Sequence, residues 1–296
     1  MHPEIPSLPC FLNGNYSTLA DAKVSVLDRG FIFGDGVYEV VPVYGGRPFR
    51  FEHHLARLSR SLAELKIPNP YADGVWREVC TTLCQLHAQA LGASQAQQMV
   101  YFQVTRGVAM RDHAMVPGLT PTVFAMVNTL RTPGPQALAE GVRCVTADDF
   151  RWAKAHIKAT SLLGAVLARQ ISVEADATET IMFRGDELSE ASSSNVWVVK
   201  NGQVAGPPRD HRVLEGIRYG LIAELCEQAG IPFSLRPLHR DEVLGADELL
   251  LSSASKEILP VSQLDEHPIG TGRPGPIFQQ LYHGYQQAKL NPESLS

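Results

Sequence analysis

A short segment that contains two prolines and a glycine, Arg131–Pro135, divides this chain into two parts. Proline lacks the backbone N–H that helices and strands use, so this composition interrupts any regular element. With 296 residues, the chain is long enough for one large domain or for two of ordinary size. We therefore expect a small N-terminal domain over residues 1–130, a linker over 131–136 and a large C-terminal domain over 137–296.

Both parts have the pattern of a mixed α+β fold. Asn13-Gly14 is a strong signal for a tight hairpin turn, and Gly45-Gly46 suggests a second hairpin between residues 40–44 and 48–51. Apolar residues with helical spacing predict helices over 55–65, 75–86, 160–174 and 218–229. Strand-like runs lie over residues 99–105, 122–127, 142–145, 181–183, 196–199 and 249–251.

Composition and charge exclude several classes of function. A net charge of -5 without clustered lysine and arginine disfavours nucleic acid and acidic membrane surfaces as partners. No apolar run approaches the ~20 residues of a transmembrane helix, and the N-terminus does not resemble a signal peptide. The five cysteines, an odd number, are interpreted as reduced and mostly buried thiols of a cytoplasmic protein. Cys80 and Cys84 lie one helical turn apart but have no further histidine or cysteine nearby, and adjacent His53 and His54 do not share a helix face, so we expect no metal.

Two segments carry most of the expected chemistry. Lys158 stands directly before an apolar helix with no other cation beside it until Arg169, and Glu190 lies within a run of very small residues, Leu188–Asn195. An amine at the edge of an apolar core is a usable nucleophile for a carbonyl group. A carboxylate beside a flat ligand suits a pyridine nitrogen. The ordinary alternatives are a solvated lysine and a serine-rich loop, and the combination of the two segments favours the functional interpretation.

These two segments resemble the cofactor motifs of the fold-type IV pyridoxal-phosphate enzymes and, within them, of the D-amino acid aminotransferases. The resemblance implies a two-domain α+β fold with pyridoxal 5'-phosphate at the domain interface. It makes Lys158 the residue that forms a Schiff base with the cofactor and then moves the substrate proton. It makes Glu190 the partner of the pyridine nitrogen. The turn that lines the cofactor would contain Ser193, Ser194 and Asn195.

Two further residues are assigned by the same resemblance. Arg57 lies beside the apolar face of the helix expected over 55–65, and its guanidinium suits bidentate binding of phosphate. The resemblance makes Arg57 the ligand of the cofactor phosphate, whereas the alternative is an ordinary surface arginine. The glycine-rich block Asp28–Glu39 leads to Tyr38, which would line the substrate pocket. The alternative for Tyr38 is a core position on a strand.

Arg111 and His113 distinguish among members of the family. If their loop is extended, a spacing of two places both side chains on the same side, where they could hold a substrate carboxylate. In D-amino acid aminotransferases such a pair binds the α-carboxylate together with the tyrosine and is donated by the partner subunit. The resemblance therefore implies a homodimer. The alternative is a solvated polar loop.

The expected phosphate site departs from the family pattern at two positions. The segment Glu215–Arg218 has Arg218 where the family commonly has a threonine, although the backbone amides of Ile217 and Arg218 remain suited to an anion at a helix N-terminus. The second segment contains Ser253 followed by Ala254, where the family usually has threonine. These substitutions put the cofactor affinity in question and leave the expected fold unchanged.

The resemblance implies transfer of an amino group from a D-amino acid such as D-alanine to a 2-oxo acid such as 2-oxoglutarate. The same fold supports two alternatives, a 4-amino-4-deoxychorismate lyase and a branched-chain L-aminotransferase, and the pair Arg111 and His113 disfavours both. A catalytically silent binding protein on this fold is the alternative from another class. It would be colourless when purified.

Overall fold

The structure is a computed structural model that describes residues 5–92 and 97–290. The N-terminal residues 1–4, part of the segment interpreted as lacking a signal peptide, lie outside these ranges. The chain forms two compact units. Unit 1 consists of residues 1–131 and 157–162, and unit 2 of residues 132–156 and 163–296. Across the described ranges, no helix is both long enough and apolar enough to span a bilayer.

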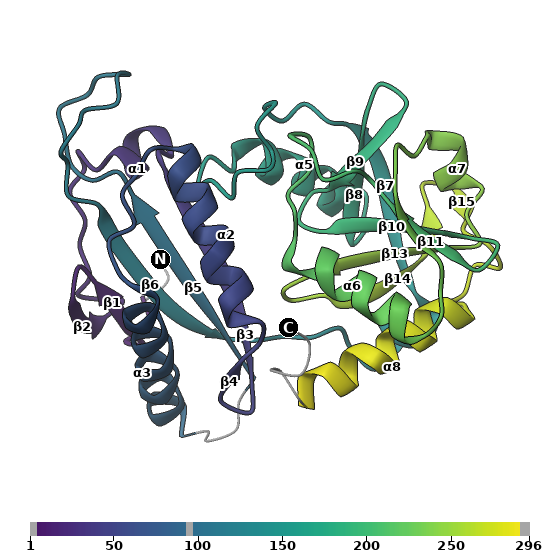
Figure 1. The fold of residues 1–296 in the computed structure, drawn as a ribbon, viewed down its shortest axis with the longest axis horizontal. Coiled ribbons are helices and arrows are strands. Elements are labelled where there is room, and N and C mark those ends of the chain that lie inside the picture. The colour runs from purple at the N-terminus through teal and green to yellow at the C-terminus, as the bar shows by residue number, and fades with distance from the viewer. Residues whose placement is uncertain (1–4, 93–96, 291–296) are drawn as a thin grey trace. The chain divides into compact units, whose positions relative to one another are not determined.

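Unit 1 is built on a six-stranded sheet with the order β2-β1-β6-β5-β3-β4, and Figure 1 shows it behind two long helices. The strands are β1 (Pro9–Leu12), β2 (Asn15–Thr18), β3 (Gly36–Tyr44), β4 (Arg47–Pro48), β5 (Gln98–Thr105) and β6 (Thr122–Thr129). All pairings are antiparallel. Both expected hairpins are present, because Asn13 with Gly14 and Gly45 with Gly46 have the positive φ angles that tight turns require.

The helices α2 (Phe51–Glu64) and α3 (Asp73–Leu91) cover one face of this sheet. Alternate residues of β3 and β5 point toward the helices and form the core with Leu58, Trp76 and Phe102, each at most 1% exposed. The opposite face carries half-buried side chains, among them Tyr38 and Tyr101. The short helix α1 (Arg29–Phe33) precedes β3.

Unit 2 contains a nine-stranded mixed sheet with the order β12-β11-β10-β13-β14-β7-β8-β9, to which β15 adds beside β14. Its strands are β7 (Val142–Asp148), β8 (Glu179–Arg184), β9 (Glu187–Ala191), β10 (Asn195–Lys200), β11 (Gln203–Gly206), β12 (Phe233–Leu235), β13 (Glu248–Ser253), β14 (Glu257–Leu264) and β15 (His267–Pro268). Strand β7 pairs in parallel with both β14 and β8. Nearly continuous burial along β8, β10 and β13 agrees with a sheet that is covered on both faces.

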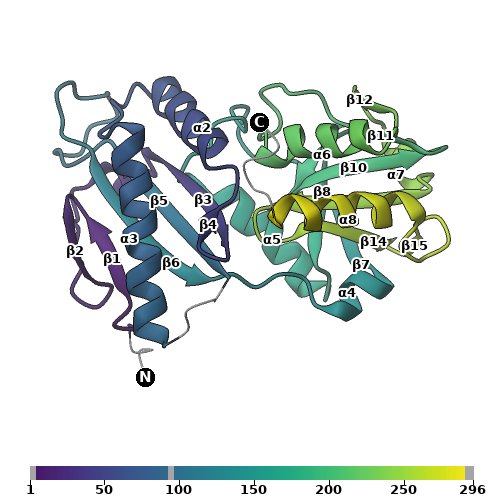
Figure 2. The same cartoon turned by 60° about the horizontal axis from the view of Figure 1, so that its bottom comes forward.

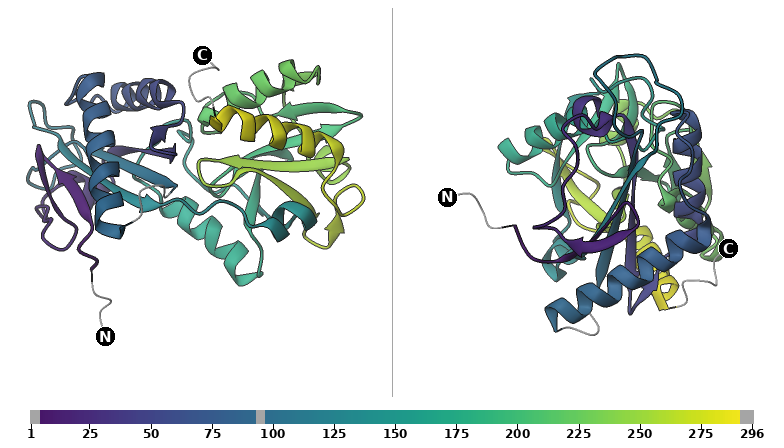
Figure 3. Two further views of the ribbon diagram at one scale, coloured as in Figure 1. Left: turned by 90° about the horizontal axis from the view of Figure 1, so that it is seen from below. Right: turned by 90° about the vertical axis from the view of Figure 1, so that its left-hand side faces the viewer.

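Helices cover the unit 2 sheet from both sides. Figure 2 shows α6 (Ile217–Gln228) and α8 (Pro276–Leu290) side by side, and Figure 3 shows α5 (Leu163–Glu174) on the opposite face. The short helices α4 (Pro135–Glu140) and α7 (Arg240–Leu244) complete the unit. Helix α8 begins where both carboxylate oxygens of Glu248 accept the amides of Ile277 and Phe278, at 2.9 and 2.8 Å.

Several expected boundaries differ from those of the structure. Residues 49–51 do not extend β4, because the chain already turns into α2 at Arg50, which has a φ of 54°. Helix α5 begins at Leu163 and not at residue 160. Residues 160–162 of that expected helix are not helical, because Thr160 and Ser161 bond to Gly34 of unit 1. The helices α1, α4, α7 and α8 were not expected from the sequence.

Candidate functional site

Lys158 lies on a segment, residues 157–162, that belongs to unit 1 although the sequence places it between two stretches of unit 2. Its carbonyl oxygen accepts the amide of Tyr38 at 3.0 Å, and Ala159 forms a bridge with Val37. Ile157 and Ala159 are buried in the unit 1 core, so alternate residues anchor the segment and leave Lys158 half-buried. This placement differs from the expectation that the lysine belongs to the C-terminal domain.

The amine of Lys158 rests on an aromatic side chain. Its Nζ lies 4.2 Å from the ring centroid of Tyr38, which in turn stacks on Tyr101 with centroids 5.7 Å apart. Within the described residues, Lys158 has no carboxylate partner and no hydrogen bond at Nζ. Burial, together with neighbouring Tyr38, raises the pKa of Tyr101 to about 12, so Tyr101 stays neutral. The amine of Lys158 therefore lies against the aromatic ring of Tyr38, which stacks on Tyr101, and forms no ion pair with the described residues.

Gly34 fixes the register of the lysine segment. Its carbonyl oxygen accepts the hydroxyls of Thr160 and Ser161, each at 2.9 Å. Gly34 has a φ of 66°, and a Cβ at this position would lie 2.8 Å from Ser161 Oγ. Only glycine therefore permits both the left-handed turn and the close approach.

Arg57 is buried in a charge cluster on the helix-covered face of β3. Its Nε and Nη2 donate to the two oxygens of Glu39 at 2.7 and 2.8 Å, and His54 Nδ1 lies 2.7 Å from Glu39 Oε2. Burial alone would raise the pKa of Glu39, but Arg57 and His54 hold it far below its ordinary value. Arg57 is therefore not a solvated surface residue. Glu39 fixes the plane of its guanidinium.

Arg111 and His113 are both exposed and both reach Phe33 at the end of α1. The guanidinium carbon of Arg111 lies 5.5 Å from the ring centroid of Phe33, and the ring of His113 lies 5.4 Å from it. The loop is held at Asp112, whose carbonyl oxygen accepts Nη1 of buried Arg29 at 2.6 Å. The structure thus brings the two sequence-predicted side chains together around one aromatic ring.

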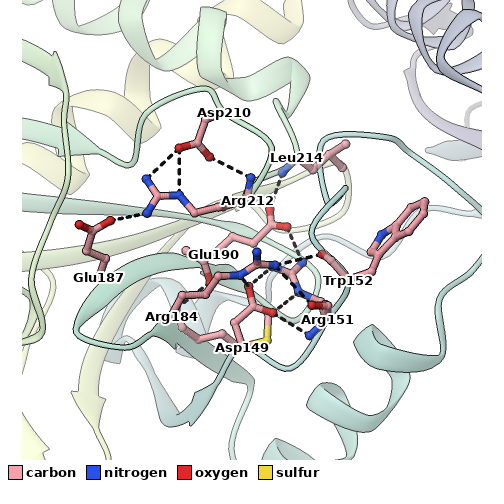
Figure 4. A network of polar contacts seen from close by, with 11 residues as sticks. Asp149, Arg151, Trp152, Arg184, Glu187, Glu190, Asp210, Arg212 and Leu214 are labelled. Atoms are coloured by element: carbon pink, nitrogen blue, oxygen red, sulfur yellow. Dashed lines mark hydrogen bonds and ion pairs between the residues drawn. The ribbon is translucent and has the colours of Figure 1, made fainter.

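Glu190 is buried in unit 2 at the centre of the network in Figure 4. Arg151 Nη1 donates to Glu190 Oε1 at 2.5 Å, and Asp149 holds Arg151 through Nε and Nη2, both at 2.9 Å. The second oxygen of Glu190 accepts the amide of Leu214 at 3.1 Å and Asn195 Nδ2 at 3.2 Å. Burial raises the pKa of Glu190 above its ordinary value, and the cation of Arg151 offsets only part of this rise.

The residues expected to line the cofactor or to bind its phosphate lie on three segments of unit 2. The hydroxyls of Ser193 and Ser194 donate to buried Glu179, at 2.5 and 2.8 Å. Ser253 Oγ accepts a backbone amide of its own turn, and neighbouring Ala254 is half-buried. These serine hydroxyls therefore bond within the protein.

The N-terminus of α6 supplies the backbone amides of Ile217 and Arg218. The side chain of Arg218 is buried, and its Nη2 donates to Tyr285 Oη on α8 at 2.9 Å. This side chain therefore joins α6 to α8. At the N-cap, a Cβ on Gly216 would lie 2.1 Å from Asn195 Oδ1, so this glycine allows the helix to begin beside the residue that holds Glu190.

The sequence of residues 36–264 matches the family model described as amino-transferase class IV. The chain belongs to this family. Among its relatives, the D-alanine aminotransferase of Staphylococcus aureus (strain N315) is 37% identical over 278 residues, which cover 94% of this chain and 96% of that protein. The D-alanine aminotransferase of Bacillus licheniformis is 35% identical over 279 residues, with the same coverage of 94% and 96%.

Solved structures of branched-chain aminotransferases have the same fold. The branched-chain amino acid aminotransferase of Escherichia coli superposes with a TM-score of 0.86 at 24% identity and covers 97% of this chain and 94% of that one. The branched-chain aminotransferase of Thermoproteus uzoniensis with norvaline gives a TM-score of 0.83 at 24% identity, with coverage of 98% and 97%. At these identities the likeness shows the fold alone, which is the two-domain fold-type IV architecture expected from the sequence.

The residues present fit the cofactor of a class IV aminotransferase. Unit 1 supplies a buried guanidinium and an amine that has no carboxylate partner among the described residues. Unit 2 supplies a buried carboxylate and the N-terminus of a helix. These groups match an aldehyde, a phosphate and a ring nitrogen. The chemistry of Lys158, Arg57, Glu190 and the amides of Ile217 and Arg218 therefore suits these three groups.

The partners of the charged residues in this class IV aminotransferase were not expected from the sequence. Glu39, Asp149 and Arg151 each fix the orientation of a candidate site residue or of its partner. Glu39 directly follows Tyr38, and Arg151 lies seven residues before Lys158. One signal in the sequence was a charged residue among the apolar residues of a strand, as Glu39 is in β3, because such a residue needs a buried partner.

Replacement of Glu39 by glutamine should destabilise the protein in a pH-dependent way. The change leaves the Arg57 cation buried without its counter-charge, so the free energy of unfolding at pH 7 should fall by about 3–5 kcal/mol. Because the pKa of Glu39 is lower in the folded state, its contribution is present above the unfolded value of roughly 4.3 and is lost as the pH falls toward the folded value. In urea unfolding, the difference in the free energy of unfolding between wild type and Glu39→Gln should therefore become smaller as the pH is lowered.

The matched control is Glu52→Gln, on the same helix as Arg57 but with a side chain that is 61% exposed in its pair with Arg77. Its stability should change by less than about 1 kcal/mol. Equal stability of Glu39→Gln and wild type at pH 7 would contradict the structural role of the cluster.

Replacement of Arg151 by methionine should raise the pKa of Glu190 further, because the cation that opposes the effect of burial is lost. Isotope-edited infrared titration of the carboxyl band measures this shift directly. The control Arg184→Met removes a cation that contacts Asp149 but not Glu190, so it should change the titration less. An unchanged midpoint in Arg151→Met would show that the observed ion pair does not control this proton.

Proposed function

We propose that this class IV aminotransferase transfers the amino group of a D-amino acid such as D-alanine to a 2-oxo acid such as 2-oxoglutarate, with pyridoxal 5'-phosphate as cofactor. The observation that carries the proposal is the amine of Lys158, which lies over Tyr38 at 4.2 Å without a carboxylate partner among the described residues. The donor substrate is supported by relatives that are D-alanine aminotransferases over 94% of this chain.

Each candidate residue has a role in this reaction. When bound, pyridoxal phosphate supplies an aldehyde for amines and an aromatic ring that accepts the electron pair released at the substrate α-carbon. Lys158 Nζ takes the proton from that carbon and returns it, since it is not held in an ion pair. Glu190 would pair with the ring nitrogen and favour its protonated form, and Arg151 keeps the carboxylate oriented. Arg57 and the amides of Ile217 and Arg218 hold the phosphate.

The substrate carboxylate is held by Arg111, His113 and Tyr38. We propose that the chain forms a homodimer in which the first two residues enter the site of the partner. The support is the apolar surface around their loop, because Met110 is 77% exposed and Phe31 is 71% exposed. Large apolar side chains at this exposure favour burial against another molecule.

A cytoplasmic location belongs to the same proposal. All five cysteines are buried free thiols, which is the state that a reducing compartment maintains.

A half-reaction with the two enantiomers of alanine tests the function. The purified holoenzyme should lose its cofactor absorbance with D-alanine and retain it with L-alanine. Borohydride reduction should attach the cofactor to Lys158, and Lys158→Ala should abolish the half-reaction. Lys154→Ala, an exposed position four residues earlier, is the matched control and should remain active. Equal rates with both enantiomers would exclude the D-specific assignment and direct attention to the L-aminotransferase.

Mixed dimers test whether Arg111 acts in the partner's site. Arg111→Ala and Lys158→Ala homodimers should both be inactive, the first because it lacks the carboxylate clamp. When the two variants are mixed and allowed to exchange subunits, one site of each mixed dimer regains both residues if Arg111 acts across the interface. Activity should then recover to about one quarter of wild type, the statistical share of intact sites. Absence of recovery, with exchange verified by mass, would place Arg111 and Lys158 of one chain in the same site.

A further inference from the structure

A buried carboxylate in unit 2 gathers four donors although the proposed reaction assigns it no role. Glu179 begins β8 and is 0% exposed. It accepts the hydroxyls of three consecutive serines, which are Ser192, Ser193 and Ser194, and it accepts Lys256 Nζ at 2.8 Å. Lys256 Nζ also donates to Ser193 Oγ at 2.9 Å. Glu179 therefore has three hydroxyl donors in addition to its ion pair with Lys256.

These contacts join the two turns that the family resemblance places at the cofactor. Residues 192–194, here called the serine turn, follow directly after Glu190 and Ala191 at the end of β9 and lead to Asn195 in β10. Residues 254–256, here called the β13–β14 turn, connect strands β13 and β14 and include Lys256. Glu179 lies on a third strand, so one carboxylate fixes both turns against the interior of the sheet.

The direction of the hydroxyls has a consequence for ligand binding. A serine hydroxyl carries one hydrogen, and in the serine turn all three hydrogens are donated to Glu179. Ser253 Oγ instead accepts the amide of Lys256 at 3.1 Å, and this bond does not use the hydrogen of the Ser253 hydroxyl. An anion beside the serine turn therefore meets backbone N–H groups and not hydroxyl donors. At the β13–β14 turn, the side chain of Ala254 offers no donor.

We propose that Glu179 and Lys256 are positioning residues that hold the serine turn and the β13–β14 turn so that their backbone, and not their hydroxyls, binds the cofactor. This inference rests on the proposed function. Burial alone would raise the pKa of Glu179, but Lys256 and the serine hydroxyls lower it below the ordinary value, which keeps the carboxylate charged at neutral pH.

Titration of the cofactor-free protein with pyridoxal 5'-phosphate, followed by fluorescence, tests the assignment. Glu179→Gln and Lys256→Met should each weaken binding by about 10- to 100-fold, the range for losing a hydrogen bond to a charged group. The double variant should bind pyridoxal 5'-phosphate within about threefold of the weaker-binding single variant, because both changes break the same contact between Glu179 and Lys256. Lys256→Arg, which keeps the charge, should recover part of the affinity.

Two matched variants separate backbone binding from hydroxyl binding. Ala254→Thr restores a hydroxyl and should change the affinity by less than about threefold, since that is under 0.7 kcal/mol. Lys200→Met breaks an exposed ion pair with Asp247 on the same sheet and should leave the affinity unchanged. Thermal unfolding of each variant, measured without cofactor, separates loss of affinity from loss of fold.

Two results would overturn the assignment. One is a Lys256→Met variant that binds pyridoxal 5'-phosphate as tightly as wild type but unfolds at a lower temperature, because Lys256 would then stabilise the fold without positioning the turns. Lys256 is partly exposed in a turn, so this variant should fold. The other is a gain of more than about tenfold in Ala254→Thr, because it would show that hydroxyls at this turn face the phosphate. Failure of the proposed function is distinct, since wild-type protein would then not bind pyridoxal 5'-phosphate or would not be labelled at Lys158.

Discussion

A carboxylate that leaves water loses several kcal/mol of hydration, and only closely placed donors restore it. Three buried carboxylates of this chain meet that requirement with cations that lie near candidate site residues. Glu39 is matched by Arg57 and His54, Glu190 by Arg151, and Glu179 by Lys256. Because the donors cannot turn away without leaving a charge uncompensated, their orientation is set before any ligand arrives. The geometry of the candidate site is thus a consequence of how its charges are buried.

The same charges explain which features could be predicted from the sequence. Helix α2 follows from the spacing of its leucines, and its pattern placed Arg57 beside the apolar face. Arg111 and His113 both lie against Phe33, although their loop bends and is not the extended segment on which the sequence argument depended. Local periodicity cannot reveal Arg151, however, because 39 residues separate it from Glu190. The donors to Glu179 lie between 13 and 77 residues away along the chain. Only the pairing of strands brings such groups together.

The start of α5 shows how tertiary contacts override a local preference. The residues after Lys158 were expected to be helical, since an apolar pattern continues from 160 to 174. In the structure, Thr160 and Ser161 instead bond to Gly34, and Ile157 and Ala159 enter the core of unit 1. These contacts stabilise a non-helical segment by more than the modest helix propensity of a few residues. Helix α5 begins only where they end.

The chain passes from one unit to the other three times, after residues 131, 156 and 162. No single cut therefore separates it into two complete folding units, even though the proline-rich segment marks an obvious joint. A polypeptide that ends at this joint keeps the sheet of unit 1 but loses Ile157 and Ala159 from its core. The two units are consequently not interchangeable modules. A hybrid of two relatives joined at residue 131 would take Lys158 from the C-terminal parent and Tyr38 from the N-terminal parent. The contact between the lysine amine and the tyrosine ring would then combine residues of two different proteins.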